Sequence, residues 1–113
     1  MSHIFLYGPP GTGKSTIGKK LARSLKLPFV DLERVIETNT DMSIAQIMEQ
    51  QGESVFRDME TAVLKETVGH ASSVTDASGK VIALGGGALL REENRTLVEA
   101  HGKVILLMAE LPT

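Results

Sequence analysis

The 113-residue sequence contains no cysteine and no apolar run long enough to cross a lipid bilayer. Without cysteine, the protein can form neither a disulfide nor a thiolate that binds a metal or attacks a substrate. This suits a reducing cytoplasm, where we expect the protein to be. The amino terminus also lacks the basic residues and the apolar stretch of a signal peptide. We therefore expect no membrane span and no membrane partner.

A large excess of charge of one sign is also missing. The sequence has 12 basic and 14 acidic residues, which gives a net charge of -2. Such a balance creates no broad field for attracting nucleic acid or anionic lipid, so any phosphate must be bound locally. Hydrophobic residues make up 42% and charged residues 23% of the sequence. This composition and this length predict one globular domain with one core, spanning residues 1–113.

The order of apolar runs and glycine-rich breaks predicts an α/β fold. Short apolar runs favour four strands, at about residues 3–7, 27–31, 81–84 and 104–108. Apolar residues at helical spacing predict helices that begin at Lys14, after Ser43, after Gly52 and near Arg91. A series of strand, helix and strand favours a parallel sheet with right-handed crossovers.

Two of these helices carry a clear apolar stripe that should face the sheet. In the first helix the stripe consists of Ile17, Leu21, Ala22 and Leu25, and in the helix after Gly52 it consists of Phe56, Met59, Ala62 and Val63. Residues at this spacing lie on one side of a helix, so we expect both sets to be buried.

The strongest motif lies between the first predicted strand and the first predicted helix. Residues 8–15 read GPPGTGKS, which satisfies Gly-x4-Gly-Lys-[Ser/Thr] in the strand, loop and helix context that a P-loop requires. Its backbone N–H groups and the helix N-terminus can hold the β-phosphate of a nucleotide. Lys14 suits the β- and γ-phosphates, and the Ser15 hydroxyl suits Mg²⁺. A plain glycine turn would need neither lysine nor serine here.

We expect ATP and Mg²⁺ as cofactors, held by Gly11, Thr12, Gly13, Lys14, Ser15 and Thr16. Asp31 and Glu33 follow the second predicted strand, at the end of the sheet where ligands of open α/β folds bind. One carboxylate can serve Mg²⁺, and the other can serve an acceptor hydroxyl. Alternatively, both simply favour the first turn of the next helix through its dipole.

Two further features are open to a structural or a functional interpretation. Arg57 and Glu60 lie three residues apart, so they can form a surface ion pair, or Glu60 can hold Arg57 for bidentate binding of a carboxylate. The glycines at 85–87 end the third predicted strand. They form either a plain turn or a place where a ligand approaches bare backbone N–H groups.

Taken in order along nearly the whole chain, these residues resemble the shikimate kinases. The most specific part is Phe-Arg-x-x-Glu combined with the glycine triplet, because many P-loop kinases share the rest. The shared features are Gly-x4-Gly-Lys-Ser-Thr, Phe29-Val30-Asp31 with Ile36-Glu37, Ser43-Ile44, Gly52-Glu53, Phe56-Arg57 with Glu60, and Leu84-Gly85-Gly86-Gly87-Ala88.

The resemblance implies phosphoryl transfer from ATP to shikimate, giving shikimate 3-phosphate for aromatic amino-acid biosynthesis. Arg57 would bind the carboxylate of shikimate and Glu60 would orient Arg57. Lys14 and Asp31 would be catalytic, with Ser15 and Asp31 serving the metal. The substrate would be bound by Glu33, Arg57, Gly85, Gly86 and Gly87, with the glycines also contacting the γ-phosphate.

The resemblance also implies a sheet order of 2-3-1-4-5 and a longer chain. Family members continue through a lid that bears a catalytic arginine, a fifth strand and a closing helix, so we expect an amino-terminal fragment with four strands in the order 2-3-1-4. The fourth strand would then be an exposed edge through which the fragment self-associates. The family usually has aspartate where this chain has Glu33, which lengthens that side chain by one methylene.

Three other functions compete with this interpretation. A related small-metabolite kinase, such as a gluconate kinase, would share the P-loop, and Arg57 argues only for a carboxylate on the acceptor. A motor ATPase would need an apolar strand that ends in Asp-Glu, whereas the candidate strands here end at Gly85 and near Glu110. A nucleotide-binding fragment without turnover is the third alternative, because the lid would be missing.

Overall fold

The computed structural model describes residues 3–8, 13–69 and 79–107. Its centre is a parallel sheet whose strands are β1 (His3–Tyr7), β2 (Phe29–Asp31), β3 (Val81–Ala83) and β4 (Gly102–Leu106). The order across the sheet is β2-β3-β1-β4, as predicted. β1 therefore lies between β3 and β4, with Phe5 paired to Ile82 on one side and to Val104 on the other.

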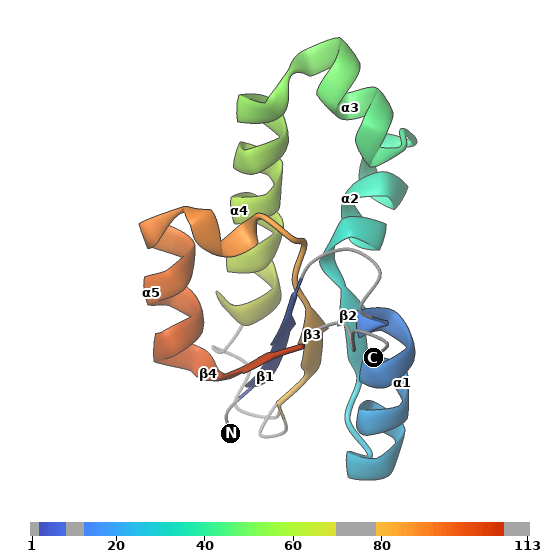
Figure 1. The fold of residues 1–113 in the computed structure, drawn as a ribbon, viewed down its shortest axis with the longest axis vertical. Coiled ribbons are helices and arrows are strands. Elements are labelled where there is room, and N and C mark those ends of the chain that lie inside the picture. The colour runs from blue at the N-terminus through green and yellow to red at the C-terminus, as the bar shows by residue number, and fades with distance from the viewer. Residues whose placement is uncertain (1–2, 9–12, 70–78, 108–113) are drawn as a thin grey trace, which may run out of the picture.

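Helices cover both faces of this sheet and extend beyond it. Figure 1 shows α1 on one side of the sheet, α4 and α5 on the other, and α2 and α3 reaching past the carboxyl ends of the strands. A short 3-10 helix, η1, follows β3. The bounds are α1 (Lys14–Leu25), α2 (Leu32–Thr40), α3 (Ile44–Gln51), α4 (Glu53–Gly69), η1 (Ala88–Leu90) and α5 (Glu92–His101).

The two faces of the sheet form two apolar clusters. Neighbouring strand residues point to opposite faces, so Phe5 joins the cluster with α4 and α5, whereas Leu6 joins the cluster with α1. The first cluster is larger and includes Leu32, Ile36, Phe56, Leu64 and Val98. It fixes α4 against the sheet and so fixes the residues that α4 carries.

The predicted apolar stripes were partly wrong. Ile17 and Leu25 are 42% and 46% exposed, because α1 turns Gly18 and Ala22 toward the sheet instead. A Cβ at Gly18 would collide with the Phe29 ring, so glycine allows this close approach.

The stripe of α4 also differs from the prediction, since Ala62 is exposed. Leu64 and Val68 are buried together with Phe56 and Val63, and Glu60 shares this face. The buried face is therefore rotated relative to the predicted one and includes a carboxylate.

Strand limits differ from the sequence prediction where backbone pairing decides them. β2 begins at Phe29 rather than Leu27, because Pro28 has no N–H to donate and only its carbonyl accepts, from Val81 N at 2.9 Å. β4 begins at Gly102, whose lack of a side chain lets it lie against the backbone of His3. Met108, at the end of the predicted run, lies outside the described residues.

α2 directly follows β2, and the sequence analysis did not delimit it. Its first turn is capped by Asp31, and α3 begins with a complete capping box between Ser43 and Gln46. Across 3–8, 13–69 and 79–107, no helix has both the length and the apolar composition needed to cross a membrane.

Candidate active site

The described part of the P-loop leads into the N-terminus of α1. Gly13 caps α1 with a φ of 79°, a left-handed conformation that suits glycine. The first turn of α1 contains no acidic residue, and no side chain of the described residues caps it, so its N–H groups suit an anion. Lys14 donates from Nζ to the Gly8 carbonyl oxygen over 2.6 Å. Thr16 is exposed in the same turn, whereas Gly11 and Thr12 lie outside the described residues.

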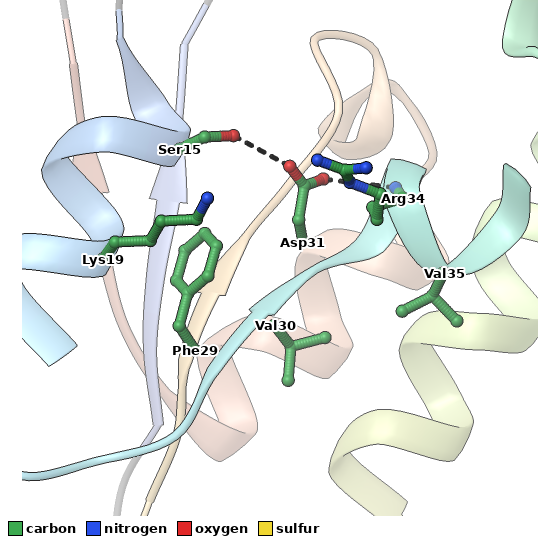
Figure 2. Close-up of a pocket in the computed structure, with 7 residues that line it drawn as sticks. All are labelled: Ser15, Lys19, Phe29, Val30, Asp31, Arg34 and Val35. Atoms are coloured by element: carbon green, nitrogen blue, oxygen red, sulfur yellow. Dashed lines mark hydrogen bonds between the residues drawn. The ribbon is translucent and has the colours of Figure 1, made fainter. Parts of the chain in front are cut away.

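Ser15 and Asp31 form a pair of oxygen groups beside this loop. The Ser15 hydroxyl donates to Oδ2 of Asp31 over 2.8 Å, while Oδ1 of Asp31 accepts from the Arg34 N–H at 3.4 Å. Asp31 thus caps α2, as the structural interpretation predicted, and its other oxygen faces the P-loop serine. Figure 2 shows this pair at a pocket of about 320 Å³ that is lined by Ser15, Lys19, Phe29, Val30, Asp31, Arg34 and Val35.

The donor set at this pair suits Mg²⁺ better than a metal held wholly by protein. Mg²⁺ commonly takes one or two protein oxygens and completes its shell with water and phosphate oxygens. Among the described residues, no three His, Cys, Asp or Glu side chains converge as a metal site. Ser15 and Asp31 therefore fit an ion that arrives with a nucleotide.

Arg57 and Glu60 form a second charged group, on α4. Nη1 of Arg57 donates to Oε1 of Glu60 over 3.1 Å, and its Nη2 donates to Glu53 over 3.2 Å. The side chains of Arg57 and Glu60 are only 16% and 1% exposed. A surface pair is therefore excluded, and Arg57 is held in one orientation from two sides.

This group keeps one donor and one acceptor unused. Nε of Arg57 and Oε2 of Glu60 are buried, and neither has a hydrogen-bond partner in the described part of the chain. Leaving such atoms unpaired is costly, so they mark a place where a polar ligand would be stabilised. A carboxylate can accept from the guanidinium, and a hydroxyl can donate to the free oxygen of Glu60.

Glu33 lies between the P-loop and the Arg57–Glu60 pair. Burial raises the pKa of Glu33, the positive charge of Lys14 opposes this rise, and the negative charge of Asp31 adds to it. Burial likewise raises the pKa of Glu60, and its hydrogen bond and ionic contact with Arg57 oppose the rise. Burial acts to lower the pKa of Arg57, but Glu60 and Glu53 outweigh it and raise that pKa. The guanidinium therefore remains charged.

The glycine triplet after β3 packs directly against these side chains. A Cβ at Gly85 would lie 2.7 Å from Oε2 of Glu60 and 2.8 Å from Oε2 of Glu33. A Cβ at Gly87 would lie 2.5 Å from both Nη atoms of Arg57. Glycine is needed here because the site side chains fill the space that a β-carbon would take, and not for a positive φ.

Three polar residues near the glycine triplet were missed by the sequence analysis. Tyr7 donates from its hydroxyl to the Gly86 carbonyl over 3.0 Å, and Asn94 donates from Nδ2 to the Ala88 carbonyl over 2.8 Å. Thr61 bonds to Asn94 in the core. A polar residue on the apolar face of a helix, as at 61 and 94, is the signal that could have revealed them.

Comparison with known proteins gives one consistent result. Residues 10–113 match the sequence profile of the family described as Shikimate kinase. A curated shikimate kinase from Pseudomonas syringae pv. syringae is 43% identical over 111 residues, which cover 98% of this chain and 60% of that protein. The chain therefore spans about three fifths of the length of this relative.

Solved structures agree in fold. Shikimate kinase from Acinetobacter baumannii, in complex with shikimate, superposes with a TM-score of 0.84 and 37% identity over 97% of this chain and 57% of that one. A gluconokinase from Sinorhizobium meliloti 1021 reaches a TM-score of 0.53 at 17% identity over 96% of this chain and 58% of that one, which shows likeness of fold alone. From the P-loop in its strand and helix context, the buried arginine–glutamate pair and these matches, we conclude that the chain belongs to the shikimate kinase family.

Proposed function

We propose that these 113 residues form the nucleotide-binding part and most of the acceptor-binding part of an enzyme that phosphorylates shikimate. The reaction transfers the γ-phosphoryl group of ATP to a hydroxyl, giving shikimate 3-phosphate. Family membership supports the reaction class. The observation that carries the acceptor assignment is the buried Arg57–Glu60 pair, with its unused Nε donor and Oε2 acceptor beside the glycine triplet.

In this proposal the nucleotide is bound at the amino end of α1. Gly11, Thr12, Gly13 and Thr16 surround its phosphates, and the open N–H groups of the α1 first turn favour their negative charge. Ser15 and Asp31 hold Mg²⁺, which neutralises charge on the β- and γ-phosphates when it is bound.

Catalysis rests on positioning and on charge stabilisation, because phosphoryl transfer requires little covalent chemistry from the protein. Lys14 leaves the Gly8 carbonyl and follows the γ-phosphoryl group as negative charge builds on its oxygens. Asp31 is catalytic in the sense that it fixes the metal while its second oxygen stays bonded to the α2 N-terminus. The same strand end thus supports both the helix and the nucleotide.

The acceptor lies between α4 and the glycine triplet. Arg57 binds its carboxylate, Glu33 and the free oxygen of Glu60 accept from its hydroxyls, and the N–H groups of Gly85, Gly86 and Gly87 contact the acceptor and the γ-phosphate. An acceptor that carries both a carboxylate and hydroxyls matches this set of one cation and two carboxylates. Gluconate also carries both groups, so it serves as the competing ligand in the test.

Calorimetry with shikimate and with its methyl ester tests the role of Arg57. The ester keeps the ring hydroxyls but lacks the negative charge, so Arg57→Ala should weaken shikimate binding by about 2 to 3 kcal/mol and leave ester binding nearly unchanged. Gluconate should bind more weakly than shikimate to the unaltered protein.

Arg57→Lys is the matched control, since it keeps the charge but loses the planar fork and should recover only part of the affinity. Arg23→Ala, on the exposed side of α1, should have no effect. An equal loss for shikimate and its ester in Arg57→Ala would contradict the carboxylate assignment, and tighter binding of gluconate would contradict the choice of acceptor.

A further inference from the structure

Every carbonyl group from Gly85 to Leu90 accepts a hydrogen bond from within the protein. Two of these bonds come from the backbone of the same segment, since Gly85 accepts from Ala88 N and Gly87 accepts from Leu90 N, each over 3.1 Å. The other four carbonyls accept from side chains. The donors are the Tyr7 hydroxyl to Gly86 at 3.0 Å, Asn94 Nδ2 to Ala88 at 2.8 Å, and Arg95 Nη1 to Leu89 at 2.9 Å and to Leu90 at 3.3 Å.

The N–H groups of the triplet, in contrast to its carbonyls, form no hydrogen bond within the described residues. Within residues 3–8, 13–69 and 79–107, those of Gly85, Gly86 and Gly87 have no hydrogen-bond acceptor. The carbonyls of the triplet are all bonded and its N–H groups lack acceptors within those ranges, so this part of the structure presents only donors from the triplet to a ligand. It therefore favours an anion or an electron-rich oxygen.

A buried network links this segment to the helix that carries Arg57. Asn94 is 0% exposed, and its Oδ1 accepts from the Thr61 hydroxyl over 3.0 Å, which turns its amide nitrogen toward the Ala88 carbonyl. The Thr61 oxygen in turn accepts from Nη1 of Arg91 over 3.3 Å, and Nη2 of Arg91 binds Asp58 over 2.8 Å.

Thr61 directly follows Glu60 and lies one helical turn after Arg57. The bond from Thr61 to Asn94 therefore sets the position of the guanidinium relative to the glycine N–H groups. On the other side, the Tyr7 hydroxyl connects the carboxyl end of β1 to the middle glycine. The glycine segment is thus held from two sides. Thr61 on α4 acts through Asn94 on α5, and Tyr7 on β1 binds the middle glycine directly.

We propose that Tyr7 and Asn94 are positioning residues for the acceptor. They hold the carbonyls of Gly86 and Ala88 so that the N–H groups of the triplet face the acceptor beside Arg57. Thr61 acts through Asn94 by fixing its amide. This inference rests on the proposed function, because it assigns to the triplet the task of contacting the acceptor.

Tyr7→Phe and Thr61→Val each remove one hydroxyl at nearly constant side-chain shape. Thr61→Ser keeps the hydroxyl at position 61 and is the control for Thr61→Val. We expect the dissociation constant of shikimate to rise roughly threefold to tenfold in Tyr7→Phe and Thr61→Val, the loss expected for one hydrogen bond. Thr61→Ser should recover most of it. The dissociation constant of ADP with Mg²⁺ should stay within about twofold of that of the unaltered protein. General destabilisation of the fold would instead weaken the binding of both shikimate and ADP.

Hydrogen exchange at the amides of Ala88 and Leu90, which donate to the carbonyls of Gly85 and Gly87, gives a readout that needs no ligand. Exchange there should become faster in Tyr7→Phe and Thr61→Val, and Thr61→Ser should keep the rate of the unaltered protein. Unchanged exchange in both hydroxyl-free variants would overturn the inference, as would equal weakening of shikimate and nucleotide. If the unaltered protein bound no shikimate, the proposed function would fail, and the exchange rates would still decide whether Tyr7 and Asn94 hold the turn.

Discussion

Among the described residues, Lys14 donates one hydrogen bond, which goes to the Gly8 carbonyl. A bond to a neutral carbonyl is weaker than a contact with doubly charged phosphate oxygens, so a bound nucleotide would draw the ammonium group away from Gly8. The ammonium group is thus held in place by a weak partner and remains available to bind phosphate. Among the described contacts it donates to no carboxylate.

Removing this charge should abolish nucleotide binding. In Lys14→Ala the β-phosphate keeps the helix N-terminus but loses its one mobile cation. Calorimetry with ADP and Mg²⁺ measures the effect. Lys20→Ala is the matched control, because Lys20 is an exposed lysine of the same helix and does not line the pocket at Ser15 and Asp31. A folded, unaltered protein that gave no binding signal would contradict the P-loop assignment itself.

Glu60 should make the stability of the protein depend on pH. Burial raises its pKa above the ordinary value of 4.5, so between 4.5 and the raised pKa the folded state binds more protons than the unfolded state. The free energy of unfolding should therefore contain a part that is fully present below pH 4.5 and is lost as the pH rises through the raised pKa.

Urea unfolding of the unaltered protein and of Glu60→Gln at several pH values tests this sign. Glutamine cannot ionise, so its free energy of unfolding should improve relative to that of the unaltered protein as the pH rises above 4.5. Glu66→Gln, on an exposed part of the same helix, should show no such trend. A relative change in the opposite direction would mean that Arg57 stabilises the charged form more than burial opposes it.

At the scale of whole elements, β4 is an outer strand of the described sheet. It pairs only with β1, and Val104, Ile105 and Leu106 are 38%, 42% and 58% exposed. A run of exposed apolar residues with free N–H and C=O groups on one side is a template for pairing with another chain.

We expect the 113-residue chain to self-associate through β4 at micromolar concentration. Leu106→Lys places a charge on this edge and should shift the chain toward monomer in sedimentation experiments. Leu25→Lys adds the same charge at another exposed leucine, on α1, and should leave association unchanged. A monomer in both variants and in the unaltered chain would show that the edge is protected.

The elements themselves were largely predictable, and the faces of the helices were less so. The four apolar runs, together with the P-loop and the glycine triplet, predicted the strands, and the family resemblance then predicted their order in the sheet. The burial of Gly18 in place of Ile17, and of Leu64 in place of Ala62, depended on tertiary packing that no local pattern encodes. The same holds for the Tyr7 hydroxyl, whose partner lies 79 residues away in the sequence.

At the scale of the whole molecule, the fold brings Lys14 and Ser15, Arg57 and the glycine triplet to one end of the sheet. The chain covers 60% of the length of its Pseudomonas syringae relative. Family members place a lid with a catalytic arginine in the remaining part, according to the resemblance. Transfer by these 113 residues alone should therefore be slow even where binding is intact.

A chimera tests this expectation. It continues the chain with the carboxyl-terminal part of the Pseudomonas syringae enzyme, and we expect it to phosphorylate shikimate at least about a thousandfold faster than the 113 residues alone, from the contribution of a charge-stabilising arginine. The same chimera with its lid arginine replaced by alanine is the control and should lose most of the gain. Equal turnover by the 113 residues would show that catalysis needs no lid.

The position of β1 between β3 and β4 limits how early the sheet can form during synthesis. β1 is made first, yet its neighbours are β3 and β4, whose residues lie at 81–83 and 102–106. β2 cannot pair earlier, because its one neighbour is β3. Pairing over such separations is slow, since a long loop must close before any contact forms. The phosphate loop directly follows β1 in the sequence, yet it gains its supporting sheet only after β3 and β4 have been synthesised.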